Sequence, residues 1–201
     1  MSTTDEKWMD LALEQATAAL AAGEFPVGAL IVGAGQAVAS GRRQHSRGCA
    51  ITKSQPPATD AHRLAPATAA EDQPAIPANE LEHAEMVALR ELLTRQPAIE
   101  RAGLTIYTTL EPCLMCYAAL LLNGVHRIVY AYEDTMGGGT KLPLDQLAPL
   151  YRELAARVTV IPHVRRARSL ALFKEFFTEP ANTYWQNSPL AEYTLSQKSD
   201  C

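Results

Sequence analysis

The 201-residue sequence lacks long apolar runs and has few cysteines and aromatic residues. No run is long enough to cross a bilayer, and the acidic start MSTTDEKWMD is unlike a secretory signal peptide. We therefore expect a cytoplasmic protein without a membrane partner. Only one pair of cysteines is closely spaced, which argues against a disulfide framework and indicates reduced thiols; the four are Cys49, Cys113, Cys116 and Cys201.

An excess of positive charge is also absent. Lysine and arginine number 18 against 22 aspartates and glutamates, which gives a net charge of −4. Strong non-specific binding to nucleic acid is therefore not expected, because that binding depends on neutralising phosphates. Apolar residues make up 47% and charged residues 20%, as in an ordinary globular chain whose length suits one domain.

The order of predicted elements indicates the fold class. From residue 104 onward, strand, helix, strand, helix and strand alternate, so helical crossovers make the last strands parallel. With an opening hairpin, this predicts a three-layer α/β/α domain with a mixed sheet of about five strands. The predicted helices cover 4–22, 80–95, 112–122, 144–156 and 163–178, and the predicted strands lie in FPVGALIV, QAVAS, LTIYTTL, HRIVYAY and RVTVIP.

Two segments do not fit this alternation. Residues 45–79 are rich in proline and alanine, show no sustained period and are interpreted as a long surface loop. The tail 179–201 is predicted to be irregular; its TYWQNSPL segment either covers the active site of a partner subunit or only packs back onto the body. We therefore expect a domain over 1–178, with the loop 45–79 inserted, and a tail over 179–201.

Two short motifs carry the chemistry. Cys113 and Cys116 open a predicted helix, whose N-terminal dipole favours thiolates, and His83 begins another helix. Thiolate and imidazole are ligands that zinc prefers, and three protein ligands leave the fourth position open, as in catalytic zinc sites. Water at such a position becomes a nucleophile near neutral pH, and Glu85, two residues from His83, is placed to shuttle its proton.

Three other interpretations stay open at this point. A structural zinc site needs a fourth ligand, for which Cys49, His62 and His126 are candidates. A Cys-x-x-Cys pair after a strand is also typical of thioredoxin-like redox proteins, although that chemistry has no use for His83 and Glu85. Finally, two buried cysteines can simply pack in a core.

The motifs HAEM and PCLMC resemble the H-x-E…P-C-x-x-C signature of zinc nucleobase deaminases. With FPVGALIV, HAEMVALREL, LTIYTTLEPCLMCYAALLLNGVHRIVYAYED and LALFKEFF, the chain is similar to the cytidine/deoxycytidylate deaminase superfamily over most of 5–178. The predicted parallel last strands are similar to its branch of bacterial tRNA adenosine deaminases and guanine and cytosine deaminases. The resemblance implies a cytidine-deaminase-like fold and a homodimer.

The resemblance also implies roles for individual residues. His83, Cys113 and Cys116 take the positions of zinc ligands, and Glu85 takes that of the proton shuttle. Zinc-bound hydroxide would attack the carbon that bears an exocyclic amine, and ammonia would leave. The backbone of Ala84 would contact the base, and Val27 would line its pocket.

The sequence departs from the family pattern at one residue that binds the substrate. Members of this branch usually carry a base-binding asparagine after the second strand, where this chain reads SGRRQHSRG. Gln44 is the nearest amide and our predicted substrate contact, with Arg43 and His45 as alternatives. We expect a zinc-dependent hydrolytic deaminase of a small amino-substituted nucleobase or nucleoside. The alternatives are a deaminase of the wobble adenosine in tRNA, which VRRARSLALFKEFF would contact if it is not simply a core helix, and a non-catalytic zinc-stabilised interaction domain.

Overall fold

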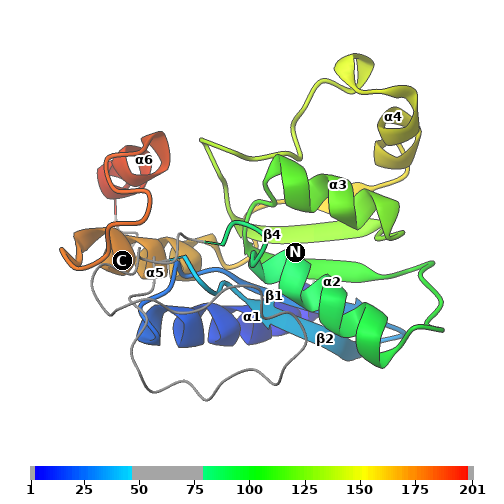
Figure 1. The fold of residues 1–201 in the computed structure, drawn as a ribbon, viewed down its shortest axis with the longest axis horizontal. Helices are drawn as coiled ribbons and strands as arrows, with labels where there is room; N and C mark the ends of the chain where they lie inside the picture. Colours follow the sequence, from blue (N-terminus) through cyan, green and yellow to red (C-terminus); the bar gives the residue numbers. More distant parts are fainter. Residues whose placement is uncertain (1–2, 47–78, 199–201) are drawn as a thin grey trace, which may run out of the picture.

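The structure, a computed structural model, describes residues 3–46 and 79–198 (Figure 1). Its sheet has five strands in the order β2-β1-β3-β4-β5. Strand β1 pairs antiparallel with β2 and β3, while β3, β4 and β5 are parallel. The predicted mixed sheet with parallel last strands is therefore confirmed. The strands are β1 (Gly28–Gly33), β2 (Gln36–Arg42), β3 (Thr105–Leu110), β4 (Arg127–Tyr132) and β5 (Thr159–Ile161).

Helices cover both faces of the sheet, as the three-layer prediction requires (Figure 1). Because side chains alternate along a strand, the central strands β1, β3 and β4 each contribute to two separate cores. Leu30 and Val129 pack with α1 (Thr3–Ala21), whereas Ile31 and Ile128 belong to the larger core of the opposite face. That larger core includes residues of α2 (Ala84–Arg95) and α3 (Leu114–Leu122). No helix of the described residues is long and apolar enough to cross a membrane.

Helix α2 begins at Ala84, so the predicted start at residue 80 is wrong. Asn79 does not cap this helix; its side-chain oxygen instead accepts a hydrogen bond from the Leu81 amide. The Glu82 carbonyl accepts from the Gln44 amide, which holds this segment beside the end of β2. His83 consequently keeps an extended backbone, with φ −63° and ψ 147°, immediately before the helix.

The predicted helix over 144–156 is divided into two pieces. A short 3₁₀ turn, Leu144–Gln146, precedes helix α4 (Pro149–Ala155). Proline disfavours helical backbone in the residue before it, and Ala148 is indeed extended, with ψ 148°. Helix α5 (Arg166–Thr178) also begins three residues later than predicted, because His163 and Arg165 have left-handed backbone.

The tail after residue 178 is not irregular throughout, which corrects the prediction. It contains helix α6 (Pro189–Ser196), and the Ala191 amide in its first turn donates to the side chain of Ser188. Proline at the first helical position after a serine cap is a recognisable start signal. The helix packs near α5 (Figure 1), and Tyr193 Oη donates to Glu133 at 2.7 Å. The segment 47–78, with most of the predicted loop, lies outside the described residues.

Candidate metal centre and its cavity

Two helix starts bring three potential metal ligands together. His83 precedes α2, Cys113 precedes α3, and Cys116 lies in the first turn of α3. His83 Nδ1 lies 3.5 Å from the sulfur of Cys113 and 3.5 Å from that of Cys116. All three donor atoms lie within 4.8 Å of one another. Ligand atoms around a tetrahedral zinc ion lie about 3.5 Å apart, so the donor set and its spacing fit zinc.

The charge of this cluster also suits a cation. A hydrogen bond from Cys116 and the contact with His83 outweigh the effect of burial and together lower the pKa of Cys113 to about 4. The pKa of Cys116 is raised, because its thiol donates a hydrogen bond to Cys113 and is buried. Burial alone lowers the pKa of His83, but its contacts with Cys113 and Glu85 outweigh burial and raise it. Cys113 is therefore the donor of the cluster that favours the thiolate form, and thiolate is the form that binds metal.

Glu85 lies beside the cluster on the first turn of α2. Its side chain is buried, and its Oε1 accepts a hydrogen bond from Thr108 Oγ1 at 3.0 Å. Its Oε2 lies 3.6 Å from the sulfur of Cys116. Burial raises the pKa of this carboxyl, and the nearby thiolate of Cys113 adds to the effect. A carboxyl with a raised pKa next to a metal site suits proton transfer.

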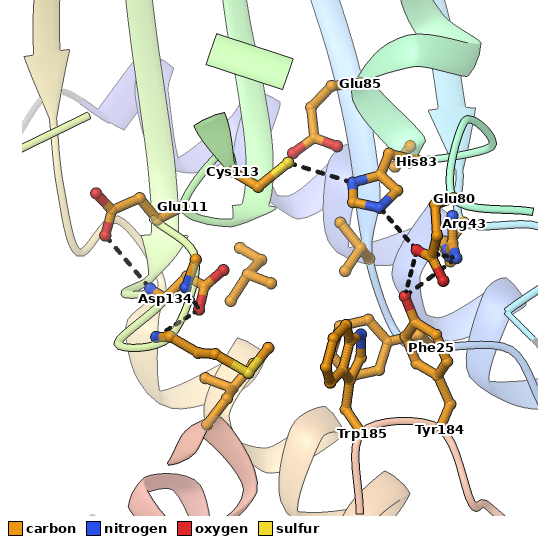
Figure 2. Close-up of a pocket in the computed structure, with 16 residues that line it drawn as sticks. Phe25, Arg43, Glu80, His83, Glu85, Glu111, Cys113, Asp134, Tyr184 and Trp185 are labelled. Atoms are coloured by element: carbon orange, nitrogen blue, oxygen red, sulfur yellow. Dashed lines mark hydrogen bonds and ion pairs between the residues drawn. The ribbon is translucent and has the colours of Figure 1, made fainter. Parts of the chain in front are cut away.

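A cavity of about 350 Å³ opens in front of the cluster (Figure 2). Val27 and Ala84 line it, together with His83, Glu85 and Cys113. Gln44 does not line it, whereas Arg43 does. The reason is local: the Arg43 amide still donates to the Val27 carbonyl beyond β2, so residue 43 continues the strand and successive side chains point to opposite sides.

The structure also bears on the other metal interpretations. His126 is exposed and does not belong to the donor cluster found in the described residues. Cys49 and His62, the other candidates for a fourth ligand, lie outside the described residues. His83 lies against both sulfurs and Glu85 lies against one, an arrangement that neither a redox dithiol nor simple core packing requires.

The far wall of the cavity comes from the C-terminal segment. Tyr184, Trp185 and Leu190 line it, and all three belong to the same chain as the metal cluster. The TYWQNSPL segment thus contributes to the cavity of its own chain. The only sequence signal was an aromatic pair in an otherwise polar tail, which does not reveal where that pair packs.

A tightly held loop after β4 forms a third wall. Asp134, Met136 and Gly137 line the cavity, and Glu111 accepts a hydrogen bond from the Asp134 amide at 3.3 Å. A Cβ atom at Gly138 would lie 2.6 Å from the Asp134 carbonyl oxygen. Gly138 also pairs with Cys113 in an isolated β-bridge, so this loop packs directly against the metal site.

Comparison with known proteins now adds to this geometry. Residues 2–132 match the family described as "Cytidine and deoxycytidylate deaminase zinc-binding region". The chain belongs to this deaminase family. Its metal is accordingly zinc, and His83, Cys113 and Cys116 form the cluster able to bind it.

This deaminase is similar in sequence to tRNA-specific adenosine deaminases and in fold to a guanine deaminase. It is 30% identical to the tRNA-specific adenosine deaminase of Bacillus subtilis, over 72% of this chain and 73% of that protein. It is 29% identical to the tRNA-specific adenosine deaminase of Aquifex aeolicus, over 67% of this chain and 70% of that protein. A solved guanine deaminase from Nitrosomonas europaea shares the fold, with a TM-score of 0.58 and 21% identity over 85% of this chain and 83% of that chain.

Proposed function

We propose that this deaminase replaces the exocyclic amine of a small nucleobase or nucleoside with oxygen and releases ammonia. One observation carries the proposal: the ligand cluster and buried Glu85 open together into a cavity closed on its far side by the chain's own C-terminal segment. A cavity of about 350 Å³ is at the small end of the range for small-molecule sites.

In this proposal His83, Cys113 and Cys116 are the zinc ligands. A bound zinc ion supplies Lewis-acid activation of water. Glu85 holds the proton on Oε2 and passes it to the departing amine; its burial and raised pKa favour a carboxyl that can carry a proton near neutral pH. Water and the amine are consumed, and an oxo group and ammonia are formed. Ala84 and Val27 orient the base, with Arg43 in the place we first assigned to Gln44.

The charge of the cavity supports a small substrate over RNA. Its lining includes four carboxylates and one arginine: Glu80, Glu85, Glu111, Asp134 and Arg43. Arginines at the start of α5 do not present free positive charge either, because Arg165 and Arg168 pair with Asp10. Arg166 similarly pairs with Glu133. RNA binding depends on cations that meet phosphates, and these cations already have carboxylate partners.

Deamination of adenosine in tRNA is the second candidate. The observation in its favour is the name of the relatives, since both bacterial relatives above are tRNA-specific adenosine deaminases. A base presented by an anticodon loop would have to reach the cavity past Trp185, whose side chain is exposed beside it. A homodimer also remains a prediction, which the mass of the zinc-loaded protein in solution would test.

Ammonia release by zinc-quantified protein would test the proposal. The panel includes guanine, cytosine and adenine, their nucleosides and nucleotides, and a tRNA-Arg anticodon stem-loop assayed separately for inosine. We expect turnover of a small molecule and no inosine in the stem-loop. Inosine in the stem-loop alone would replace the proposal with the tRNA candidate.

Glu85→Gln separates catalysis from a zinc-stabilised binding role. The amide has nearly the same shape but cannot carry the proton, so we expect zinc content to be retained and kcat to fall by about 10²–10⁴-fold. The ligand variant His83→Ala serves as the contrast, because it should lose zinc and activity together. If the wild-type protein binds zinc but releases no ammonia from any substrate, the interaction-domain alternative is favoured.

A further inference from the structure

One carboxylate oxygen on the cavity wall is shared by three donors from distant parts of the chain. Glu80 Oε2 accepts from Arg43 Nη2 at 3.1 Å and from Tyr184 Oη at 2.8 Å. It also lies 3.4 Å from His83 Nε2 (Figure 2). The other ring nitrogen of His83, Nδ1, faces the two cysteine sulfurs. Glu80 therefore connects a metal-facing histidine to the C-terminal segment.

We propose that Glu80 is a positioning residue for His83, and that Tyr184 holds Glu80 in place so that the C-terminal segment raises the affinity of the metal site. The inference rests on the proposed role of His83 as a zinc ligand. A histidine that binds metal through one nitrogen needs an acceptor for the other N–H, which sets its tautomer and the direction of its ring. Glu80 is the carboxylate in reach of that nitrogen.

Tyr184 matters because Glu80 is not held by burial. The Glu80 side chain is 53% exposed, so a carboxylate here would lose rotamer freedom on turning toward His83. The Tyr184 hydroxyl offsets this cost, since its own position is determined by packing: its ring contacts Phe25 in the core at 5.3 Å between centroids. The tail thus supplies a fixed donor for the exposed side chain of Glu80.

Charge gives Glu80 a second role at the same site. Arg43 is 2% exposed, and its guanidinium lies over the Tyr184 ring at 5.3 Å. A buried cation close to a site for a divalent metal disfavours metal binding by repulsion. Glu80 pairs with this guanidinium and lies between it and His83, which reduces that repulsion. Removing the carboxylate would both release His83 and leave the cation unpaired.

Competition between the zinc-loaded full-length protein and a chromophoric chelator would measure the effect. We expect Glu80→Gln to weaken zinc binding by about 10- to 100-fold, as for other partners of metal-binding histidines. Tyr184→Phe removes one hydroxyl and should weaken it by about 3- to 10-fold. Tyr193→Phe is the matched control: it removes a hydroxyl from the same tail, bound to Glu133 rather than Glu80, and should leave zinc affinity unchanged.

The double variant Glu80→Gln/Tyr184→Phe tests the connection itself. If Tyr184 acts through Glu80, the second substitution adds little to the first, and the visible spectrum of the cobalt-substituted protein changes in both single variants. Glu80→Gln could fail to fold because Arg43 loses its carboxylate partner. In that case the zinc affinities of Tyr184→Phe and Tyr193→Phe are compared instead. Equal zinc affinity in those two tyrosine variants would overturn the inference. The proposed function would fail separately if His83→Ala bound zinc as tightly as the wild type.

Discussion

Two walls of the same cavity differ in how they are built. The metal wall consists of His83, Glu85 and Cys113, which lie at the starts of two helices packed on the central sheet. The C-terminal wall consists of Tyr184 and Trp185, and Trp185 has left-handed backbone at φ 56° and a side chain that is 44% exposed. The reacting groups thus come from short motifs at the starts of packed helices, whereas the shape of the site depends on the C-terminal segment.

The largest effect is expected from removing a ligand in the metal wall. Cys113→Ala removes one of three ligands, so we expect zinc affinity to fall by about 10³-fold or more and turnover to disappear. Zinc content by mass spectrometry and ammonia release would check this. Cys201→Ala removes a thiol outside the motif and serves as the control. Full zinc content in Cys113→Ala would mean that the metal lies elsewhere.

A smaller effect is expected from a substitution that displaces helix α2 but leaves all three ligands in place. A Cβ atom at Gly41 of β2 would lie 2.1 Å from the Ala84 carbonyl oxygen and 2.6 Å from the Ala88 amide, so Gly41→Ala must displace α2. We expect a loss of about 1–3 kcal/mol in the free energy of unfolding, together with weaker zinc binding.

Gly28→Ala is the matched control for that displacement. Its Cβ would lie 2.2 Å from the Ala12 carbonyl oxygen, so it pushes α1 on the opposite face of the sheet. Chemical denaturation should show a comparable loss of stability, but chelator competition should show unchanged zinc affinity. Equal zinc affinities in the two variants would contradict the view that the position of α2 determines the metal wall.

The C-terminal wall should respond differently, through substrate affinity. Trp185→Ala removes an aromatic side chain from the cavity, so we expect KM for the small substrate to rise by about tenfold, with zinc content and kcat unchanged. Steady-state kinetics would check the expectation. Leu195→Ala, an exposed apolar residue of α6 outside the cavity lining, is the control. A fall in kcat without a change in KM would instead place Trp185 in the chemical step.

The smallest effect concerns the anchor of α6, the helix that follows the C-terminal wall, and depends on pH. Burial alone would raise the pKa of Glu133, but hydrogen bonds from Arg166 and Tyr193 outweigh burial and lower it to about 2. His163 Nδ1 also lies 3.3 Å from this carboxylate. A lowered pKa in the folded state means that the ionised group stabilises the fold above its ordinary value of 4.5 and that this contribution is lost as the pH falls toward 2.

Glu133→Gln tests that anchor. We expect the variant to be less stable than the wild type by about 1 kcal/mol at pH 7, and the difference to shrink below pH 4. Thermal unfolding across this pH range would measure it. A difference that stays constant from pH 7 to pH 2 would show that the charge of Glu133 does not anchor α6.

Several features were predictable because they depend on local pattern. Alternating strands and helices from residue 104 onward led to the parallel strands, and the motifs HAE and PCLMC led to the three clustered donors. Boundaries were predicted less well. Proline at residue 149 divided one predicted helix, and the pairing of residues 79–82 with the end of β2 delayed the start of α2.

The sequence by itself determined the order of the elements, the family and the residues able to bind zinc, because helix periods and ligand spacing are short-range properties. Only the tertiary structure decided that Arg43 rather than Gln44 lines the cavity, that Glu80 reaches His83, and that Tyr184 and Trp185 form the far wall. These placements follow from long-range packing of apolar side chains and from strand register. Neither of these leaves a periodic signal in the tail or in the segment before His83.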